Sequence, residues 1–169
     1  MQDLAIRDAV AADMPALCAV RRARSQHEGK MAEAAAATAR FLVAVTDGHI
    51  VAFASVFLRH PVKGPPKSYV PKLSDCFVAP RYRSLGIGRA LVSARERIAR
   101  AAGCEHLYVS VDRVENPRWF DFFRRRGYWP LQPEPYRKRE LRFSDDGKTE
   151  EVLARRQDLV VDLCRIEPA

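Results

Sequence analysis

Residues 73–103 read LSDCFVAPRYRSLGIGRALVSARERIARAAG, and this segment predicts a strand, a turn and a helix in succession. Leu73–Val78 is an apolar-rich run that stops at Pro80, as a short strand does. Apolar side chains then recur at helical spacing, at Ile87, Leu91, Ala94, Ile98 and Ala102. The pattern therefore predicts a helix from Gly86 to Ala102, with Gly103 able to cap its end.

The turn before this helix has the chemistry of an anion-binding site. The first N–H groups of a helix have no partner inside the helix, and its start carries partial positive charge. Gly86 and Gly88 let the backbone approach a bulky anion, and Arg83 and Arg89 flank them. A pyrophosphate site is the functional interpretation, and an ordinary tight turn is the structural alternative.

Two other phosphate-binding motifs are excluded. No Gly-Lys-Ser/Thr follows the turn, so it is not a nucleoside-triphosphate P-loop. Leu91 stands where a dinucleotide-binding turn would have its third glycine, and no acidic residue follows at the required distance.

Val78–Leu91 follows the pattern V-x-P-x-Y-R-x-x-G-I-G-x-x-L, which resembles the acyl-CoA-binding motif of the GNAT superfamily of N-acetyltransferases. Other parts of the family pattern occur in order along the chain. The hairpin FLVAVTDGHIVAFASVFL precedes the motif, and a strand at His106–Val111, then Asn116 and Gly127, follow it. The resemblance covers the chain from about Leu4 to Pro130 and rests on this order of elements.

The resemblance implies an α/β fold in a single domain over residues 1–169. The family has a mixed, mostly antiparallel sheet with helices on both faces and a V-shaped split between the fourth and fifth strands. The arm of the co-substrate acetyl-CoA enters that split. The cofactor-binding residues implied are Phe77, Val78, Arg83, Ser84, Leu85, Gly86, Ile87, Gly88, Arg89, Asn116, Phe120 and Phe123.

The second predicted helix, Pro117 to Arg126, begins at Asn116-Pro117, a good cap followed by proline. Asn116, Phe120 and Phe123 share one helical face, which the resemblance places against the cofactor. Trp119 and Phe122 are then expected to face the core. Phe123 departs from the family, because many members have a tyrosine there that protonates the departing thiolate. Another donor is then needed, with water, Tyr128, Tyr136 and Ser110 as candidates, or the thiolate leaves unaided.

Asp75 lies on the strand Leu73–Val78, where simple alternation puts it on the same side as Leu73 and Phe77. A carboxylate in a buried strand needs a partner or a task. The segment LSDCFV looks like the L-E-D-x-F-V of diamine and polyamine acetyltransferases, whose acidic pair helps to bind or deprotonate the amine. Ser74 replaces the first acid here. The resemblance implies Asp75 as the catalytic base or amine-binding group, and a structural ion pair with an arginine is the alternative.

Composition sets broad limits on the protein. The chain has 169 residues and a net charge of +8, which suits a polyanionic partner such as coenzyme A. Nucleic acid is not expected, because no aromatic side chains interleave with the basic ones. The four cysteines are scattered, which predicts free thiols, and the four histidines have no metal-ligand spacing. Neither a signal peptide nor an apolar stretch long enough to span a membrane is present, so a cytoplasmic protein is expected.

The remaining segments carry weaker signals. A strand is predicted at Leu4–Asp8, a helix from Met14 to about Ser25, and an alanine-rich helix or flap over Gln26–Thr38. In that flap His27, Glu28 and Glu33 are either substrate contacts or a solvated face. Strands are predicted at Arg40–Val45 and His49–Leu58, joined through Asp47-Gly48. Further predictions are a strand within residues 131–144, a turn at 145–147, a helix at Thr149–Gln157 and a closing strand at Leu159–Ile166.

The function expected is acyl transfer from acetyl-CoA to the primary amine of a small molecule or peptide by direct attack. Asp75 or a water would take the amine proton, and a backbone N–H near Val78 would polarise the thioester carbonyl. A non-catalytic acyl-CoA sensor is the first alternative, suggested by Phe123 and the missing second acid. A basic RNA- or ribosome-associated module is the second. The acceptor and a homodimer through the segment after Pro130 are both left open.

Overall fold

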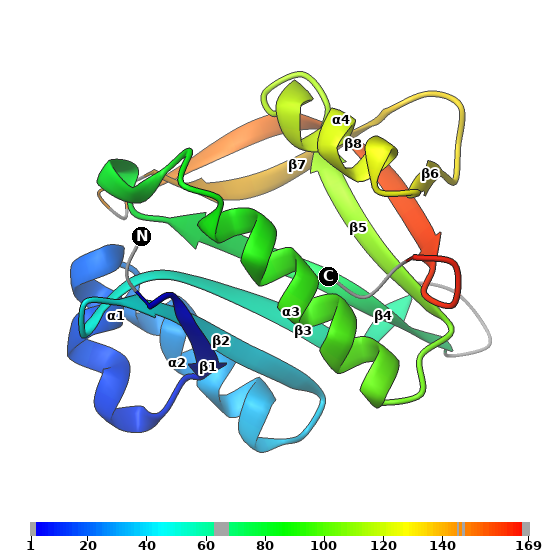
Figure 1. The fold of residues 1–169 in the computed structure, drawn as a ribbon. Helices are drawn as coiled ribbons and strands as arrows, with labels where there is room; N and C mark the ends of the chain where they lie inside the picture. Colours follow the sequence, from blue (N-terminus) through cyan, green and yellow to red (C-terminus); the bar gives the residue numbers. More distant parts are fainter. Residues whose placement is uncertain (1–2, 63–67, 145, 147, 167–169) are drawn as a thin grey trace.

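The computed structural model describes residues 3–62, 68–144, 146 and 148–166 (Figure 1). Within these residues an eight-stranded sheet runs in the order β1-β2-β3-β4-β5-β8-β6, with β7 paired to β8. The strands are β1 (Ala5–Asp8), β2 (Ala39–Thr46), β3 (His49–Val62), β4 (Ser68–Val78), β5 (His106–Asp112), β6 (Trp129–Pro130), β7 (Tyr136–Phe143) and β8 (Thr149–Asp162). The helices are α1 (Met14–Val20), α2 (Arg24–Ala35), α3 (Ile87–Ala101) and α4 (Pro117–Arg125), with 3-10 turns η1 (Ala11–Asp13) and η2 (Pro80–Tyr82).

The sheet is divided between β4 and β5. These strands form the parallel pair of an otherwise antiparallel arrangement, and they pair only at Lys72↔Tyr108 and Leu73↔Val109. Beyond Leu73 the two strands diverge, as Figure 1 shows. The predicted V-shaped split between the fourth and fifth strands is therefore confirmed.

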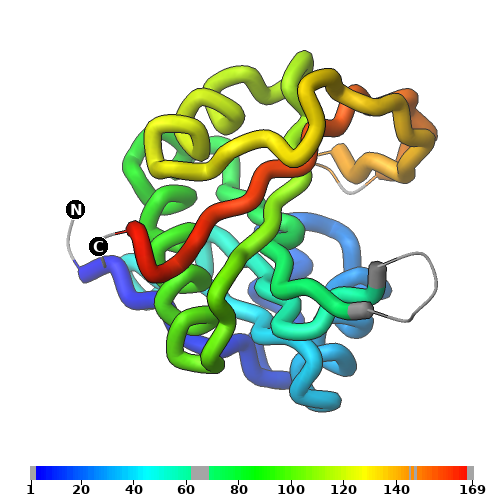
Figure 2. Tube along the Cα trace, turned by 90° about the vertical axis from the view of Figure 1, so that its right-hand side faces the viewer, coloured from blue at the N-terminus to red at the C-terminus, as the bar shows by residue number. Residues whose placement is uncertain are grey.

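Helices cover both faces of the sheet, as predicted. Figure 2 shows α3 on one side and α1 with α2 on the other. Ile87 and Leu91 of α3 pack into a core cluster with residues of β2 and β3, including Leu42. Leu17 of α1 packs on the opposite face with Phe41 and other aromatic side chains of β2, β3 and β4.

A β-bulge at Asp75 interrupts β4. Ala54 pairs with Cys76 and Ser55 pairs with Ser74, so Asp75 has no partner in the register, and its φ is +31°. An extra residue reverses the alternation of side chains along a strand. Leu73 accordingly packs in the cluster that contains Val92 of α3, whereas Phe77 packs with Leu17 of α1. The expectation that Leu73, Asp75 and Phe77 share one side was wrong.

Three other local predictions need correction. The first helix ends at Val20 and not near Ser25, because Arg21 has extended backbone angles, and a separate helix α2 covers the alanine-rich segment. Thr149–Gln157 is strand and not helix, since it lies in β8 opposite β7. The closing strand begins at Thr149 and ends at Asp162, before Ile166. The predicted turn at 145–147 lies mainly outside the described residues.

The hairpin and the second helix agree with prediction. Asp47 and Gly48, both at positive φ, join β2 to β3, as an Asp-Gly turn between strands should. The helix after Asn116 spans Pro117–Arg125, and a strand, β7, lies within residues 131–144 as expected. No helix among the described residues combines the length and apolar character needed to cross a membrane.

Candidate active site

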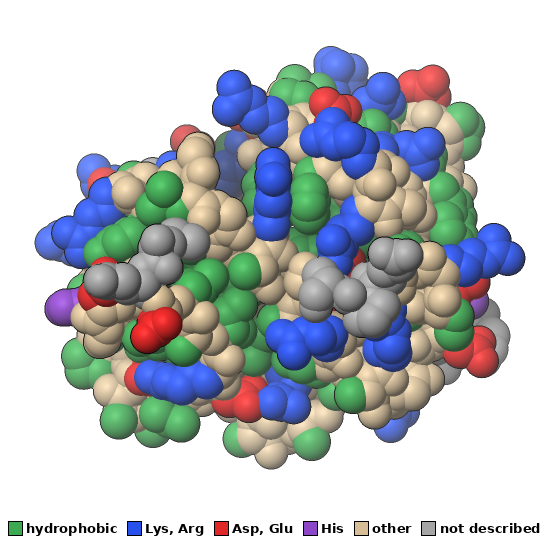
Figure 3. Space-filling view, viewed as in Figure 1, with side chains coloured by type: hydrophobic (Ala, Val, Ile, Leu, Met, Phe, Trp, Pro, Cys, Tyr) green, Lys and Arg blue, Asp and Glu red, His purple; other side chains and the backbone are tan. Residues whose placement is uncertain are grey.

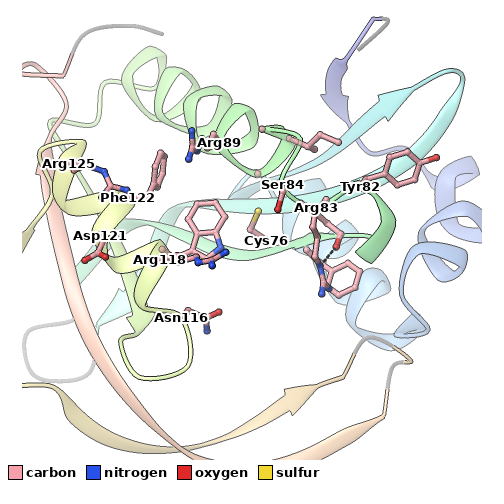
Figure 4. Close-up of a pocket in the computed structure, with 16 residues that line it drawn as sticks. Cys76, Tyr82, Arg83, Ser84, Arg89, Asn116, Arg118, Asp121, Phe122 and Arg125 are labelled. Atoms are coloured by element: carbon pink, nitrogen blue, oxygen red, sulfur yellow. Dashed lines mark hydrogen bonds between the residues drawn. The ribbon is translucent and has the colours of Figure 1, made fainter.

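A cavity of about 840 Å³ lies where β4, the turn before α3 and helix α4 meet (Figure 4). Most of the residues predicted from the motif line it: Phe77, Val78, Arg83, Ser84, Gly86, Ile87, Gly88, Arg89 and Asn116. Leu85, Phe120 and Phe123 are not among its lining residues. Cys76, Tyr82, Arg118, Trp119, Asp121, Phe122 and Arg125 line it as well and were not predicted.

The start of α3 is open toward an anion. Gly86 caps the helix at φ +84°, a left-handed conformation that glycine adopts without strain, and the described residues make no side-chain cap hydrogen bond there. Ser84 in the same turn also has positive φ. The first N–H groups of α3 therefore have neither an intrahelical acceptor nor a capping side chain, which suits a phosphate oxygen.

Positive charge surrounds this helix start. Four arginines line the cavity (Arg83, Arg89, Arg118 and Arg125), against one acid, Asp121. They come from the turn, from α3 and from α4, and Figure 4 shows them on different walls of the cavity. In Figure 3 basic side chains also gather around the α4 end of this face. Such a cavity favours a ligand with several negative charges, and coenzyme A is one.

The inner edge of β4 directs backbone groups into the split. Ala79 N donates to Val51 O at 2.9 Å, so alternation in the antiparallel ladder makes Phe77 and Phe53 a hydrogen-bonded pair. Cys76 and Val78 then direct their N–H and C=O groups away from β3 and toward the split. Val78 O accepts a hydrogen bond from Arg83 Nε at 3.0 Å. The Val78 N–H is thus oriented as a donor for a ligand atom in the split.

Helix α4 lines the first cavity with other aromatic side chains than those predicted. Trp119 and Phe122 line the cavity and also pack, partly buried, against the core cluster that they were expected to face. Phe123 is buried, with its ring centroid 4.9 Å from that of Tyr128, and it lines the smaller cavity that adjoins this one. The Arg113 guanidinium lies over the ring of Phe120, with Arg113 Cζ 4.7 Å from the ring centroid. Asn116 does reach the cavity.

A second cavity of about 370 Å³ adjoins the first. Four residues line both cavities, Cys76, Phe77, Asn116 and Trp119, and so mark their junction. Asp75, Ser110 and four arginines are among the other lining residues. The arrangement provides one cavity for a long polyanion and a smaller one for a second reactant, which meet beside the split.

Asp75 lines this second cavity but is already engaged. Its Oδ1 lies 3.3 Å from Arg21 Nη1, and its Oδ2 lies 3.1 Å from Lys30 Nζ. Both cations are largely buried. The structure therefore realises the ion pair with an arginine while placing the carboxylate where it reaches the second cavity.

Two of the candidate proton donors lie away from the cavities. Tyr128 is fully buried and donates to Glu96 Oε1 at 3.0 Å, and desolvation and that carboxylate raise the pKa of its hydroxyl well above the usual value. Tyr136 donates to Asp158 Oδ1 at 3.1 Å and lines neither cavity. Ser110 lines the second cavity. Cys76 is exposed and lines both cavities, and desolvation by the surrounding protein atoms raises the pKa of its thiol.

None of the three expected substrate contacts of α2 lines either cavity, neither His27 nor Glu28 nor Glu33. His27 is completely buried, with its Nε2 3.0 Å from Arg21 O, and Glu28 pairs with Arg24 on the surface. Sequence reasoning missed Arg21, Lys30 and Arg95. Arg95 carried a signal, because it falls four residues after Leu91 and three before Ile98, on the apolar face of the helix.

Comparisons with known proteins agree with this geometry. Residues 5–128 match the model of the acetyltransferase (GNAT) family. The chain is 43% identical over 77 residues to the aminoglycoside N(6')-acetyltransferase type 1 of Stenotrophomonas maltophilia, a match that covers 45% of this chain and 50% of that protein. The match thus spans about half the length of this curated relative.

Solved structures share the fold. The ribosomal-protein-alanine N-acetyltransferase of Brucella melitensis superposes with a TM-score of 0.70 at 21% identity, covering 94% of this chain and 99% of that one. An N-acetyltransferase of Thermoplasma acidophilum, solved with coenzyme A, superposes with a TM-score of 0.65 at 15% identity, covering 95% and 99%. From the family match, the split sheet and the open start of α3, it follows that the chain belongs to the acetyltransferase (GNAT) family.

Proposed function

We propose that this protein transfers an acetyl group from acetyl-CoA to the primary amine of a small acceptor. The observation that carries the proposal is the meeting of the two cavities at Cys76 and Asn116, beside the split between β4 and β5. A polyanion in the first cavity and an amine in the second would bring their reacting atoms together at that junction. Proximity of this kind supplies a large part of the rate enhancement in transfer reactions.

The residues present fit acetyl-CoA. The first turn of α3 and the arginines of the first cavity would hold the phosphates, as the unpaired N–H groups and the charge predict. Asn116 and the backbone edge of β4 would bind the pantetheine arm. The N–H of Val78 would donate to the thioester carbonyl oxygen and stabilise the negative charge that develops there.

The reaction proposed is a direct attack. The amine nitrogen forms a bond to the thioester carbonyl carbon, the C–S bond then breaks, and the sulfur leaves with its electron pair. The proton lost by the nitrogen passes to Asp75 or to a water that Asp75 orients. The thiolate leaves unaided or takes a proton from water or from the Cys76 thiol, which lies at the junction.

The residues of the site specify the identity of the acceptor less closely than they specify the type of reaction. Diamine and polyamine acceptors are suggested by the segment LSDCFV, and aminoglycosides by the named activity of the Stenotrophomonas relative. Both are polycations, and Asp75 is the lone carboxylate that this segment offers them. Because Arg21 and Lys30 already compensate its charge, these acceptors are the second candidates.

A thiol-release assay with acetyl-CoA tests the proposal. The acceptors are amino acids, polyamines, aminoglycosides and short peptides, and Asp75→Asn runs beside the wild type with circular dichroism as a folding control. Turnover on one acceptor class, reduced about a hundredfold or more in Asp75→Asn, is the expected result. Turnover that survives Asp75→Asn removes Asp75 from the mechanism. Coenzyme A binding without turnover on any amine contradicts the proposal and favours the sensor alternative.

A further inference from the structure

Arg95 is a buried cation with no carboxylate of the described residues within ion-pair distance. It lies on α3, is 2% exposed and lines the second cavity. Its Nε donates to Leu91 O at 3.1 Å, and its Nη1 donates to Ser55 O at 3.0 Å and to Ser74 O at 3.1 Å. Every one of these acceptors is a neutral backbone carbonyl. A buried charge without a counter-ion is costly, so such a group is expected to meet an anion.

The other cations of the second cavity are matched by protein acids. Arg142 lies 2.8 Å from Asp112, and Arg156 forms a two-armed pair with Glu140. Asp75 is shared between Arg21 and Lys30, so this group also has one positive charge in excess. The Nε of Arg21, buried with the rest of its side chain, has no hydrogen-bond partner among the described residues. Positive charge at Arg95 and in the group of Arg21, Lys30 and Asp75 is therefore left for a ligand.

We propose that the acceptor of this enzyme is a small amine that also carries a carboxylate, and that the carboxylate binds in the second cavity against Arg95, with Arg21 beside it. The inference rests on the proposed transfer to an amine and specifies its acceptor. A carboxylate would supply the missing counter-ion, and a guanidinium binds carboxylates with particular geometric fit. The cavity volume of about 370 Å³ suits a ligand the size of an amino acid.

The decisive comparison uses the wild-type protein and paired ligands. Each α-amino acid of a panel is compared with its own α-carboxamide, which removes the charge and keeps the shape. The amine of the amide is less basic and so less protonated, so a preference for the acid cannot arise from the ionisation of the amine. We expect at least one acid to exceed its amide tenfold or more in kcat/KM. Equal values across the panel, or a preference for the amides, overturn the inference.

A pair of variants assigns the preference to Arg95. Arg95→Met should abolish the discrimination between acid and amide, and Arg95→Lys should restore part of it. The matched control is Arg100→Met on the same helix, because Arg100 bonds to Leu163 O and Ile166 O and lines neither cavity. Coenzyme A affinity, measured by calorimetry, should be retained in the Arg95 variants. Discrimination that persists in a folded Arg95→Met protein overturns the assignment.

Calorimetric binding of the same ligands to the coenzyme A complex separates this inference from the proposed function. Tight binding of acids and weak binding of amides, with no turnover, would refute amine transfer and still support an anion-selective second cavity. Turnover with equal binding of acids and amides would support amine transfer and refute the inference. Preferred turnover of spermidine-type polyamines or aminoglycosides, which carry no carboxylate, would also refute it.

Discussion

Gly88 lies against the indole of Trp119, so closely that a Cβ built on Gly88 would sit 3.0 Å from Trp119 Cζ2. The contact joins the first turn of α3 to helix α4 across the first cavity. Any side chain at this position must push the indole away from the helix start. The glycine therefore sets the distance between two walls of the cavity, in addition to leaving backbone N–H groups accessible.

Gly88→Ala is expected to weaken coenzyme A binding by about tenfold, because displacing Trp119 by a few tenths of an ångström costs on the order of 1 kcal/mol. Isothermal titration calorimetry measures the change. Gly29→Ala is the control, since a Cβ there meets nothing within 4 Å and Gly29 lies in α2. Unchanged affinity in Gly88→Ala would show that the indole can shift without disturbing the cavity.

The three consecutive arginines that end α4 should differ in their effects. Arg125 lines the first cavity, whereas Arg124 donates to Tyr128 O and Arg126 pairs with Glu96. We expect Arg125→Ala to weaken coenzyme A binding about fivefold, the amount that an exposed ion pair contributes, and to weaken 3'-dephospho-coenzyme A less. Arg124→Ala, the neighbouring control, should leave both affinities unchanged. The comparison tests whether Arg125 contacts the 3'-phosphate of coenzyme A. Equal losses of affinity for both ligands would show that it contacts another part of the cofactor.

Tyr128→Phe should lower stability without lowering kcat. The variant removes the hydroxyl that donates to the buried Glu96, at a cost of about 1–2 kcal/mol in the free energy of unfolding. The hydroxyl lines neither cavity, so it should not protonate the leaving thiolate. Urea unfolding and steady-state kinetics measure the two quantities, with Tyr136→Phe as the half-exposed counterpart. A tenfold fall in the kcat of Tyr128→Phe, with coenzyme A binding intact, would instead make Tyr128 the proton donor.

The buried imidazole of His27 should cause the free energy of unfolding to fall in mild acid. Desolvation lowers the pKa of its imidazole below the usual value of about 6.5, so the folded state binds a proton less readily than the unfolded state. Stability is therefore complete above the unfolded pKa and is lost as the pH falls below about 6.5. Urea unfolding across this range should show a steeper loss in the wild type than in His27→Gln. The lowered pKa of His60 affects both proteins alike, so parallel curves would contradict the assignment to His27.

Local signals predicted the elements whose causes are local. The helix at Ile87–Ala101 follows from apolar spacing and a glycine cap, and the β2–β3 hairpin follows from Asp47-Gly48. The segment Thr149–Gln157 contains good helix formers, yet it is strand, because β7 and β8 pair over eight positions. The partner strand β7 lies outside this segment, so the composition of the segment alone does not reveal the pairing.

The sequence predicted best the part of the site that is formed by backbone groups of one segment. It predicted worst the parts where side chains from distant segments meet. The anion-binding turn depends on Gly86 and Gly88, which the motif displays. Trp119 lies against Gly88 and lines the first cavity with Phe122, whereas Phe123 of the predicted face lines the second, so helical spacing from Asn116 predicted only part of what α4 contributes. The surroundings of Asp75 depend on a bulge and on two cations from the α1–α2 region, which no local pattern specifies.

The split sheet also bears on how the protein handles an unpaired strand edge. The inner edge of β4 at Cys76 and Val78 is an edge strand, the kind of surface that recruits other chains and promotes aggregation. Here that edge lines a cavity whose other walls are the start of α3 and helix α4. A thin molecule with amide groups can still enter and complete the ladder. The break in strand pairing thus places an aggregation-prone edge inside a cavity, where only a narrow ligand can bind to it.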